Sequence, residues 1–148
     1  MLSVTRGDIF SSTQTYLCHQ CNCVSTGASG LALDVFKKYP WANVYSSRKY
    51  NDSPGKIIIR GNGTSERFVL ALLGQIYPGA PKYTRGPDSY ARRERYFKEC
   101  LERLDTLPGS FAFPYHIGCG LAGGDWSKYF VFLSDFATTH DVVLYKKF

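Results

Sequence analysis

Several features of membrane, secreted and modular proteins are missing from this 148-residue sequence. No apolar run is long enough to cross a bilayer, so we expect no membrane-spanning segment. No internal repeat, low-complexity tract or linker interrupts the chain, and its length fits one domain over residues 1–148. The first residues, MLSVTRGDIF, lack a basic segment followed by an apolar one. We therefore predict no secretory signal and expect a cytoplasmic location, with the nucleus as an alternative.

The composition argues against bulk disorder, because 44% of the residues are apolar and 20% are charged. The formal net charge of +6 favours anionic partners, from nucleotides and phosphates to nucleic acid. The same excess of positive charge also keeps a protein surface soluble without any partner. The charge therefore leaves both interpretations open.

Short apolar runs alternate with stretches of helical periodicity along the chain. The expected strands cover residues 2–5, 16–23, 56–60, 67–75, 110–115 and 142–145, and the expected helices cover 31–39, 88–107 and 126–136. Asn62-Gly63 is a strong turn signal and predicts that the two strands around it are neighbours. Several strands are apolar on both faces, which favours an α/β fold of three layers with helices on both sides of the sheet.

Within the longest expected helix, Phe97, Cys100, Leu101 and Leu104 share one face, and we expect the charged residues to cover the rest. Its arginines, Arg92, Arg93, Arg95 and Arg103, suit either a nucleic-acid patch or a solvated face with pairs such as Glu99–Arg103.

Cysteine is concentrated at one place, where Cys18, Cys21 and Cys23 form a CxxC that overlaps a CxC. Side chains alternate along a strand, so Cys18 and Cys21 should point to opposite faces, which is poor geometry for a shared metal ion. The remaining cysteines, Cys100 and Cys119, do not supply a second close pair of ligands. Five cysteines, an odd number, also favour reduced thiols. We expect neither a metal site nor a cofactor, and interpret these thiols as core residues.

Two glycine-rich segments share one design, with a strand before each and a helix after each. They are STGASG at 25–30 and GCGLAGG at 118–124. Small residues let backbone N–H groups approach an anion, and a helix N-terminus adds positive potential, so the pair could grip a diphosphate from both sides. Neither is a Walker loop, because no Gly-Lys-Ser/Thr occurs, and neither is a good dinucleotide fingerprint. The alternative is two tight turns that bind nothing.

Two polar residues stand where strands are expected to end. The amide of Asn22 can donate and accept at once, which suits a ribose hydroxyl, although Asn22 could equally be a turn residue. Asp8 could accept a hydrogen bond from the exocyclic amine of a base against which its apolar neighbour packs, or be an ordinary turn aspartate.

Three segments, taken together, resemble the macro domains, a family that binds ADP-ribose. They are TRGDIF at 5–10, HQCNCVSTGASGLALDVFKKYP at 19–40 and YHIGCGLAGGDW at 115–126, and a final strand, VVLYKK, follows them. Order and spacing match over essentially the whole chain. The second segment is similar to the ADP-ribose-1''-phosphate phosphatases, and the third to hydrolases of ADP-ribosyl adducts, including adducts on DNA. The resemblance implies a three-layer α/β/α domain with a mixed central sheet.

The resemblance also implies roles for particular residues. Asp8 would accept from the adenine amine, Ile9 would contact the ring, Asn22 would lie near the distal ribose and Tyr145 near the adenine end. The two phosphate loops would consist of Gly30, Leu31 and Ala32, and of Gly118, Cys119, Gly120, Leu121 and Ala122.

The sequence departs from the hydrolase branch at two positions that matter for chemistry. Gln75 stands where that branch has a lysine, and Ala122 stands where it has an acidic residue, which puts a covalent lysine mechanism in doubt. The remaining candidates for activating water are His19 and Asp125. His19 could be a general acid or base, or a core histidine. Asp125 could be a base or a helix N-cap, and the two roles can coexist.

The sequence therefore predicts a monomeric macro domain that binds ADP-ribose and removes the 1''-phosphate of ADP-ribose-1''-phosphate without a metal. His19 or Asp125 would activate water, and Asn22 would orient the ribose. The alternatives are a non-catalytic reader of ADP-ribose and a hydrolase that removes ADP-ribose from protein or DNA, for which the basic helix at 88–107 would suit a DNA substrate.

Overall fold

The computed structural model describes residues 1–147 and contains a six-stranded sheet with the order β1-β6-β5-β2-β4-β3. Strands β1, β6, β5, β2 and β4 run parallel, and β3 pairs antiparallel with β4 at one edge. The sheet is therefore mixed, and the predicted neighbours around Asn62-Gly63 do pair. The strands are β1 (Leu2–Arg6), β2 (Tyr16–Cys21), β3 (Ile57–Arg60), β4 (Phe68–Leu73), β5 (Ser110–Pro114) and β6 (Asp141–Lys146).

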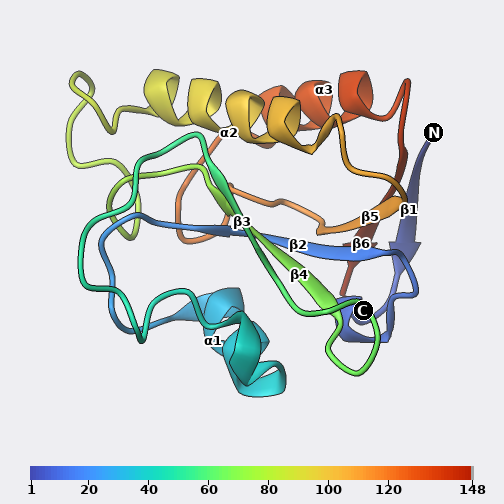
Figure 1. Cartoon of the computed structure of the whole chain (residues 1–148). Coiled ribbons are helices and arrows are strands. Elements are labelled where there is room, and N and C mark those ends of the chain that lie inside the picture. Colours follow the sequence, from blue (N-terminus) through green and yellow to red (C-terminus); the bar gives the residue numbers. More distant parts are fainter. Residues whose placement is uncertain (148) are drawn as a thin grey trace.

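Helices cover both faces of this sheet. They are α1 (Gly30–Lys38), α2 (Tyr90–Leu104) and α3 (Trp126–Phe136), and short 3-10 helices follow β1 and α1 as η1 (Ile9–Ser11) and η2 (Pro40–Ala42). Figure 1 shows α2 and α3 side by side on one face and α1 on the other. Two separate apolar clusters fill the spaces between the layers, one containing Phe97 and Leu133 and the other Leu17 and Val35. The expected three-layer α/β architecture is confirmed.

Strand β2 lies in the middle of the sheet, between β4 and β5, and is parallel to both. The carboxyl ends of these three strands consequently open onto the same edge. The segments after them, which start at residues 22, 74 and 115, meet there. Ligand sites in open α/β sheets form at such an edge.

The alternation expected for β2 is what separates its cysteines. Cys18 packs in the cluster under α2 and α3, whereas Cys21 and Cys23 pack in the cluster under α1. The two thiols of the CxxC are thus on opposite faces of the sheet, as the strand geometry predicts. All five cysteines are free, and residues 1–147 contain no group of three or more residues that could hold a metal ion.

The boundaries of β2 and α2 differ from the prediction for local reasons. Strand β2 ends at Cys21 rather than at residue 23, because the Oδ1 atom of Asn22 accepts from the backbone N–H groups of Val24 and Ser25 and turns the chain. Helix α2 begins at Tyr90, where Ser89 caps it by accepting from the N–H of Arg92.

The apolar face predicted for α2 is confirmed, but the prediction for Arg93 is wrong. Phe97, Cys100, Leu101 and Leu104 are buried, and Arg93, expected among the solvated charges, is only 2% exposed. The predicted pair of Glu99 with Arg103 also fails to form, since Arg103 instead donates to the carbonyl of Gly55. No helix in the described range, 1–147, combines the length and apolarity that a bilayer-spanning segment needs.

The burial of the cysteines gives a first testable prediction. Burial raises the pKa of the thiols of Cys21 and Cys23 to about 12 and that of the partly exposed Cys119 to about 11. A thiolate-specific reagent at pH 8 should therefore modify at most one thiol of the native chain, Cys119, and should do so slowly. In denaturant it should modify all five. Cys119→Ser is the control, and fast reaction of two or more native thiols would contradict this structure.

Candidate functional site

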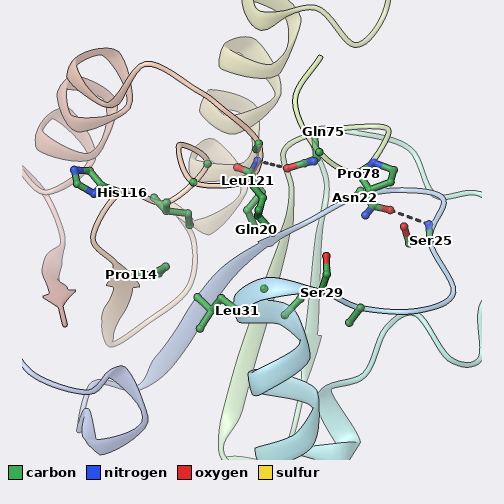
Figure 2. A pocket seen from close by; sticks show the side chains of 18 of the residues that line it. Gln20, Asn22, Ser25, Ser29, Leu31, Gln75, Pro78, Pro114, His116 and Leu121 are labelled. Atoms are coloured by element: carbon green, nitrogen blue, oxygen red, sulfur yellow. Dashed lines mark hydrogen bonds between the residues drawn. The ribbon is translucent and has the colours of Figure 1, made fainter. Parts of the chain in front are cut away.

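A cavity of about 580 Å³ opens at the carboxyl edge of the sheet. Residues 25–32, except Thr26, form one wall, and residues 114–122, except Cys119, form the opposite wall. Side chains of Gln20, Asn22 and Gln75 form the floor, and Pro78 and Gly79 close one end. Figure 2 shows Gln75, Pro78, Asn22 and Ser25 toward one end of this cavity and Leu31 and Pro114 toward the other. Its volume lies within the range of roughly 300–1,000 Å³ that is common for small-ligand sites.

The first wall contains the N-terminus of α1, and this helix lacks a side-chain cap. Ser29 occupies the N-cap position without a side-chain hydrogen bond, and the first turn holds no acidic residue. By contrast, Ser89 caps α2 and Asp125 caps α3. The first N–H groups of a helix have no partner within the helix, so those of α1 can bind an anion that enters the cavity.

The second wall is a loop of tight turns. It is held by hydrogen bonds from the N–H of Cys119 to the carbonyl of His116 and from that of Gly124 to the carbonyl of Gly118. The backbone N–H groups of Gly120, Leu121 and Ala122 have no acceptor within residues 1–147. Gly118 has φ +76°, and a Cβ atom there would lie 2.6 Å from the ring of Tyr129. Glycine is thus required at this turn.

The second wall differs from the first in how the helix behind it begins. The helix after this loop, α3, already carries an anionic cap, because Asp125 accepts from the N–H of Ser127. The loop therefore offers only its own backbone N–H groups to an anion, unlike the wall that contains α1.

The two walls approach each other at Gly30 and Leu121. Gly30 has φ +58°, and a Cβ atom there would lie 2.9 Å from Cδ1 of Leu121, whose side chain is 69% exposed. Segments with unpaired N–H groups therefore line one shared cavity from both walls. The structure thus brings together the two glycine-rich segments that the sequence marks as phosphate loops.

The floor of the cavity carries a directional chain of amide hydrogen bonds. Nε2 of Gln20 donates to Oε1 of Gln75 at 2.6 Å, and Nε2 of Gln75 donates to the carbonyl of Tyr77 at 2.8 Å. A carbonyl can only accept, so Tyr77 fixes which way both amides point. Sequence reasoning gave Gln20 no role, although the alternation of β2 puts it on the same face as Asn22.

Asn22 combines the two interpretations that the sequence leaves open. Its Oδ1 atom closes the turn at 22–25, and its side chain also lines the cavity, where it is 7% exposed. No acceptor for its Nδ2 group occurs within residues 1–147, so this group is free to donate to a ligand. From behind, Arg48 donates to the carbonyls of Asn22 and Ser25 at 3.1 and 2.9 Å and holds the turn in place.

No side chain that lines the cavity is an aspartate, glutamate, lysine or arginine. The titratable groups in the lining are His116, Tyr45 and Tyr115. Burial raises the pKa of Tyr45, whose hydroxyl oxygen accepts from the backbone N–H of Asn22 at 2.9 Å. His116, which sequence reasoning missed, has φ 66° and packs its ring 5.2 Å from that of Trp126, so the ring is turned toward α3.

The structure argues against His19 as an acid or base. Its side chain is 1% exposed, does not line the cavity and packs edge-on against Phe36 under α1, at 5.5 Å between ring centres. Burial lowers the pKa of His19 to about 4, so the imidazole is neutral at physiological pH. The alternative of a core histidine fits these observations.

Asp125 likewise lies outside the cavity lining. Its Oδ1 atom accepts from the backbone N–H of Ser127 at 3.0 Å and from the Ser127 hydroxyl at 2.7 Å, which is the arrangement of a helix N-cap. These hydrogen bonds hold the pKa of Asp125 below its ordinary value. A base that activates water inside the cavity would have to belong to its lining, and Asp125 does not.

The residues expected at the adenine end also do not line the cavity. Oδ1 of Asp8 accepts from the N–H of Phe10 and caps η1, and Ile9 is buried in the core. The hydroxyl of Tyr145 donates to Gln14 at 2.6 Å. Cys119, placed by the resemblance in the second phosphate loop, turns its thiol to the carbonyl of Ile117.

No family model and no curated protein matches this sequence. Solved structures do resemble the chain. The macrodomain of Mycobacterium tuberculosis DarG superposes with a TM-score of 0.74 at 21% identity, over 98% of this chain and 97% of that one. A protein of unknown function from Bacteroides thetaiotaomicron gives a TM-score of 0.74 at 22% identity, over 99% and 98%. Thermosipho africanus DarTG in complex with ADP-ribose superposes with a TM-score of 0.72 at 20% identity, over 97% of this chain and 41% of that one. The chain therefore has the macrodomain fold.

The capping role of Asp125 predicts a pH-dependent loss of stability. The pKa of this carboxyl is lower in the folded chain than its ordinary value of 3.8, so the charged cap stabilises the fold above that pH and is lost as the pH falls through the folded-state pKa. Asp125→Ala should lower the midpoint of thermal unfolding at pH 7, and this deficit should shrink below about pH 4.

Asp34→Ala is the matched control, because this exposed aspartate of α1 has no hydrogen-bond donor within residues 1–147. It should show no comparable loss. A deficit for Asp125→Ala that stays constant from pH 7 to pH 2 would show that the cap is not the cause.

Proposed function

We propose that this protein binds ADP-ribose in the cavity, with the diphosphate between the N-terminus of α1 and residues 120–122. The observation that carries the proposal is that two segments with unpaired backbone N–H groups line one cavity from opposite walls. A diphosphate has oxygens on both sides that can accept from both walls at once. The macrodomain fold and the DarTG structure with bound ADP-ribose support the same ligand.

The two ends of the cavity suggest which way ADP-ribose would lie in it. The distal ribose would lie at the end formed by Asn22 and Gln75, where the free Nδ2 of Asn22 can donate to a hydroxyl. The adenosine would lie at the end formed by Leu31 and Pro114, where the lining is apolar. Asp8 would then meet the base beyond the cavity rim, with the carboxylate oxygen that does not cap η1.

Replacement of Asn22 by aspartate separates its role in the turn from its role in binding. Asn22→Asp keeps the oxygen that accepts from Val24 and Ser25 but removes the Nδ2 donor and adds a negative charge near the diphosphate. Affinity for ADP-ribose, measured by calorimetry, should fall by roughly tenfold or more, about 1.4 kcal/mol, whereas the midpoint of thermal unfolding should change little.

Asn43→Asp is the matched control, because Asn43 forms the same kind of turn with the N–H groups of Tyr45 and Ser46 and does not line the cavity. It should leave the affinity unchanged. Wild-type protein that does not bind ADP-ribose would exclude the proposed function outright. Equal effects of the two substitutions would exclude the role of Asn22.

A second candidate is hydrolysis of ADP-ribose-1''-phosphate to ADP-ribose and phosphate. Two observations favour it: residues 19–40 are similar to the phosphatases of the macro domain family, and the cavity continues past Asn22 to Pro78 and Gly79, where a further phosphate could lie. His19 and Asp125 would not act directly, since neither lines the cavity. The amides of Asn22 and Gln75 would orient water without serving as a base.

The two candidates differ in turnover. Incubation of the wild-type protein with ADP-ribose-1''-phosphate should release inorganic phosphate if the phosphatase proposal holds, and Asn22→Asp should slow the release by roughly tenfold. Binding without release would make the protein a reader of ADP-ribose. A panel of ADP-ribosylated glutamate and DNA substrates tests the remaining alternative, removal of ADP-ribose from protein or DNA.

A further inference from the structure

Arg93 is a buried cation in the first turn of α2, behind the end of the cavity that Pro78 and Gly79 close. It does not line the cavity. A buried charge is costly unless it is paired and its remaining donors are satisfied, so a fully buried arginine points to a specific set of partners.

All five N–H donors of Arg93 have a partner. Nε and Nη2 donate to the two carboxylate oxygens of Asp88 at 3.1 and 2.6 Å, which gives a bidentate ion pair. Nη1 donates to the carbonyl of Gly79 at 2.6 Å and, at 3.4 Å, to that of Ala122. Nη2 also donates to the carbonyl of Tyr77 at 3.2 Å.

Two of these carbonyls belong to different loops that both line the cavity. Gly79 follows β4 and Ala122 follows β5, and one guanidinium group bonds to both. Asp88 strengthens the hold on the first loop, because its oxygens accept from the backbone N–H groups of Ile76 and Tyr77 at 2.7 and 3.1 Å. The ion pair thus fixes the separation of the two loops at this end.

The same network reaches the cavity floor. The carbonyl of Tyr77 accepts both from Arg93 and from Nε2 of Gln75, whose Oε1 atom accepts from Gln20. The orientation of both floor amides therefore depends on a carbonyl that Arg93 holds in place. Lysine at position 93 would keep the charge but could not supply a planar fork to three carbonyls and a carboxylate.

We propose that Arg93, paired with Asp88, is a positioning residue that sets the spacing of the two loops and thereby makes the cavity selective for a nucleotide with a group beyond its diphosphate. This inference rests on the proposed binding of ADP-ribose. Arg93 would not touch the ligand, and it would act through the carbonyls of Gly79, Tyr77 and Ala122. ADP, which ends at the diphosphate, would use the walls at Gly30 and Gly120. Arg93 meets the second wall only at the carbonyl of Ala122, through its longest hydrogen bond, 3.4 Å, and ADP would not reach the end at Gly79 that Arg93 chiefly organises.

The test compares Arg93→Lys with the wild type by calorimetry with ADP-ribose and with ADP. The affinity for ADP-ribose should fall by roughly tenfold, whereas the affinity for ADP should change by less than about twofold. Arg67→Lys is the matched control, because Arg67 donates to the carbonyl of Gln14 and the hydroxyl of Ser12, outside the cavity lining. It should alter neither affinity. Equal losses for ADP-ribose and ADP, or no loss for either, would overturn the proposal.

A ligand-free readout distinguishes this inference from the proposed function. In Arg93→Lys, hydrogen exchange should accelerate at the amides of Ile76 and Tyr77, which donate to Asp88. It should also accelerate at the amides of Gly123 and Gly124, which donate to carbonyls within the second loop. If the wild type fails to bind ADP-ribose but Arg93→Lys still shows this coupled change, the proposed function is excluded and the positioning role is retained. Exchange that accelerates in one loop alone would overturn the positioning role. If Arg93→Lys does not fold, Asp88→Asn, which keeps one accepting oxygen, should show the same pattern.

Discussion

The parallel pairing of β2 with both β4 and β5 is the constraint on which the cavity depends. It brings three carboxyl ends to one edge of the sheet, so three segments that are far apart in the sequence must turn away at the same place. Where they turn, their backbone N–H groups leave the hydrogen-bond ladder. Those of α1 and of residues 120–122 find no replacement partner within the described chain. The proposed anion site rests on these unpaired N–H groups.

Charge is distributed around the cavity in an unusual way. The lining contains no formally charged side chain, yet two arginines stand behind its loops, Arg48 behind residues 22–25 and Arg93 behind residues 77–79 and 122. Both arginines bind backbone carbonyls. A loop whose carbonyls are held from behind keeps a fixed conformation, and its N–H groups remain available on the cavity side. In the proposed complex the two cations would therefore act through the backbone and through their field rather than by direct contact.

Much of the framework could be predicted because it depends on local pattern. The pattern of apolar residues located the strands and α-helices but not the two 3-10 helices, and the alternation along β2 correctly separated Cys18 from Cys21. Glycine marked the two loops that meet across the cavity, because positive φ at Gly30 and Gly118 and the close approach of Leu121 and Tyr129 exclude other residues. Asn22 was recognised because a strand end is where a polar side chain can serve both a turn and a ligand.

The sequence by itself determined the fold class and the two glycine-rich loops, because backbone geometry follows from local residue preferences. Only the tertiary structure decided which side chains face the cavity. It buried His19 under Phe36, committed Asp125 to its own helix, joined Gln20 to Gln75 and placed Arg93 behind two loops. Apart from the cap of Asp125, whose partner Ser127 is local, each of these outcomes depends on a partner that is distant in the sequence or on the packing of another element. A pattern within one segment carries no information about such a partner.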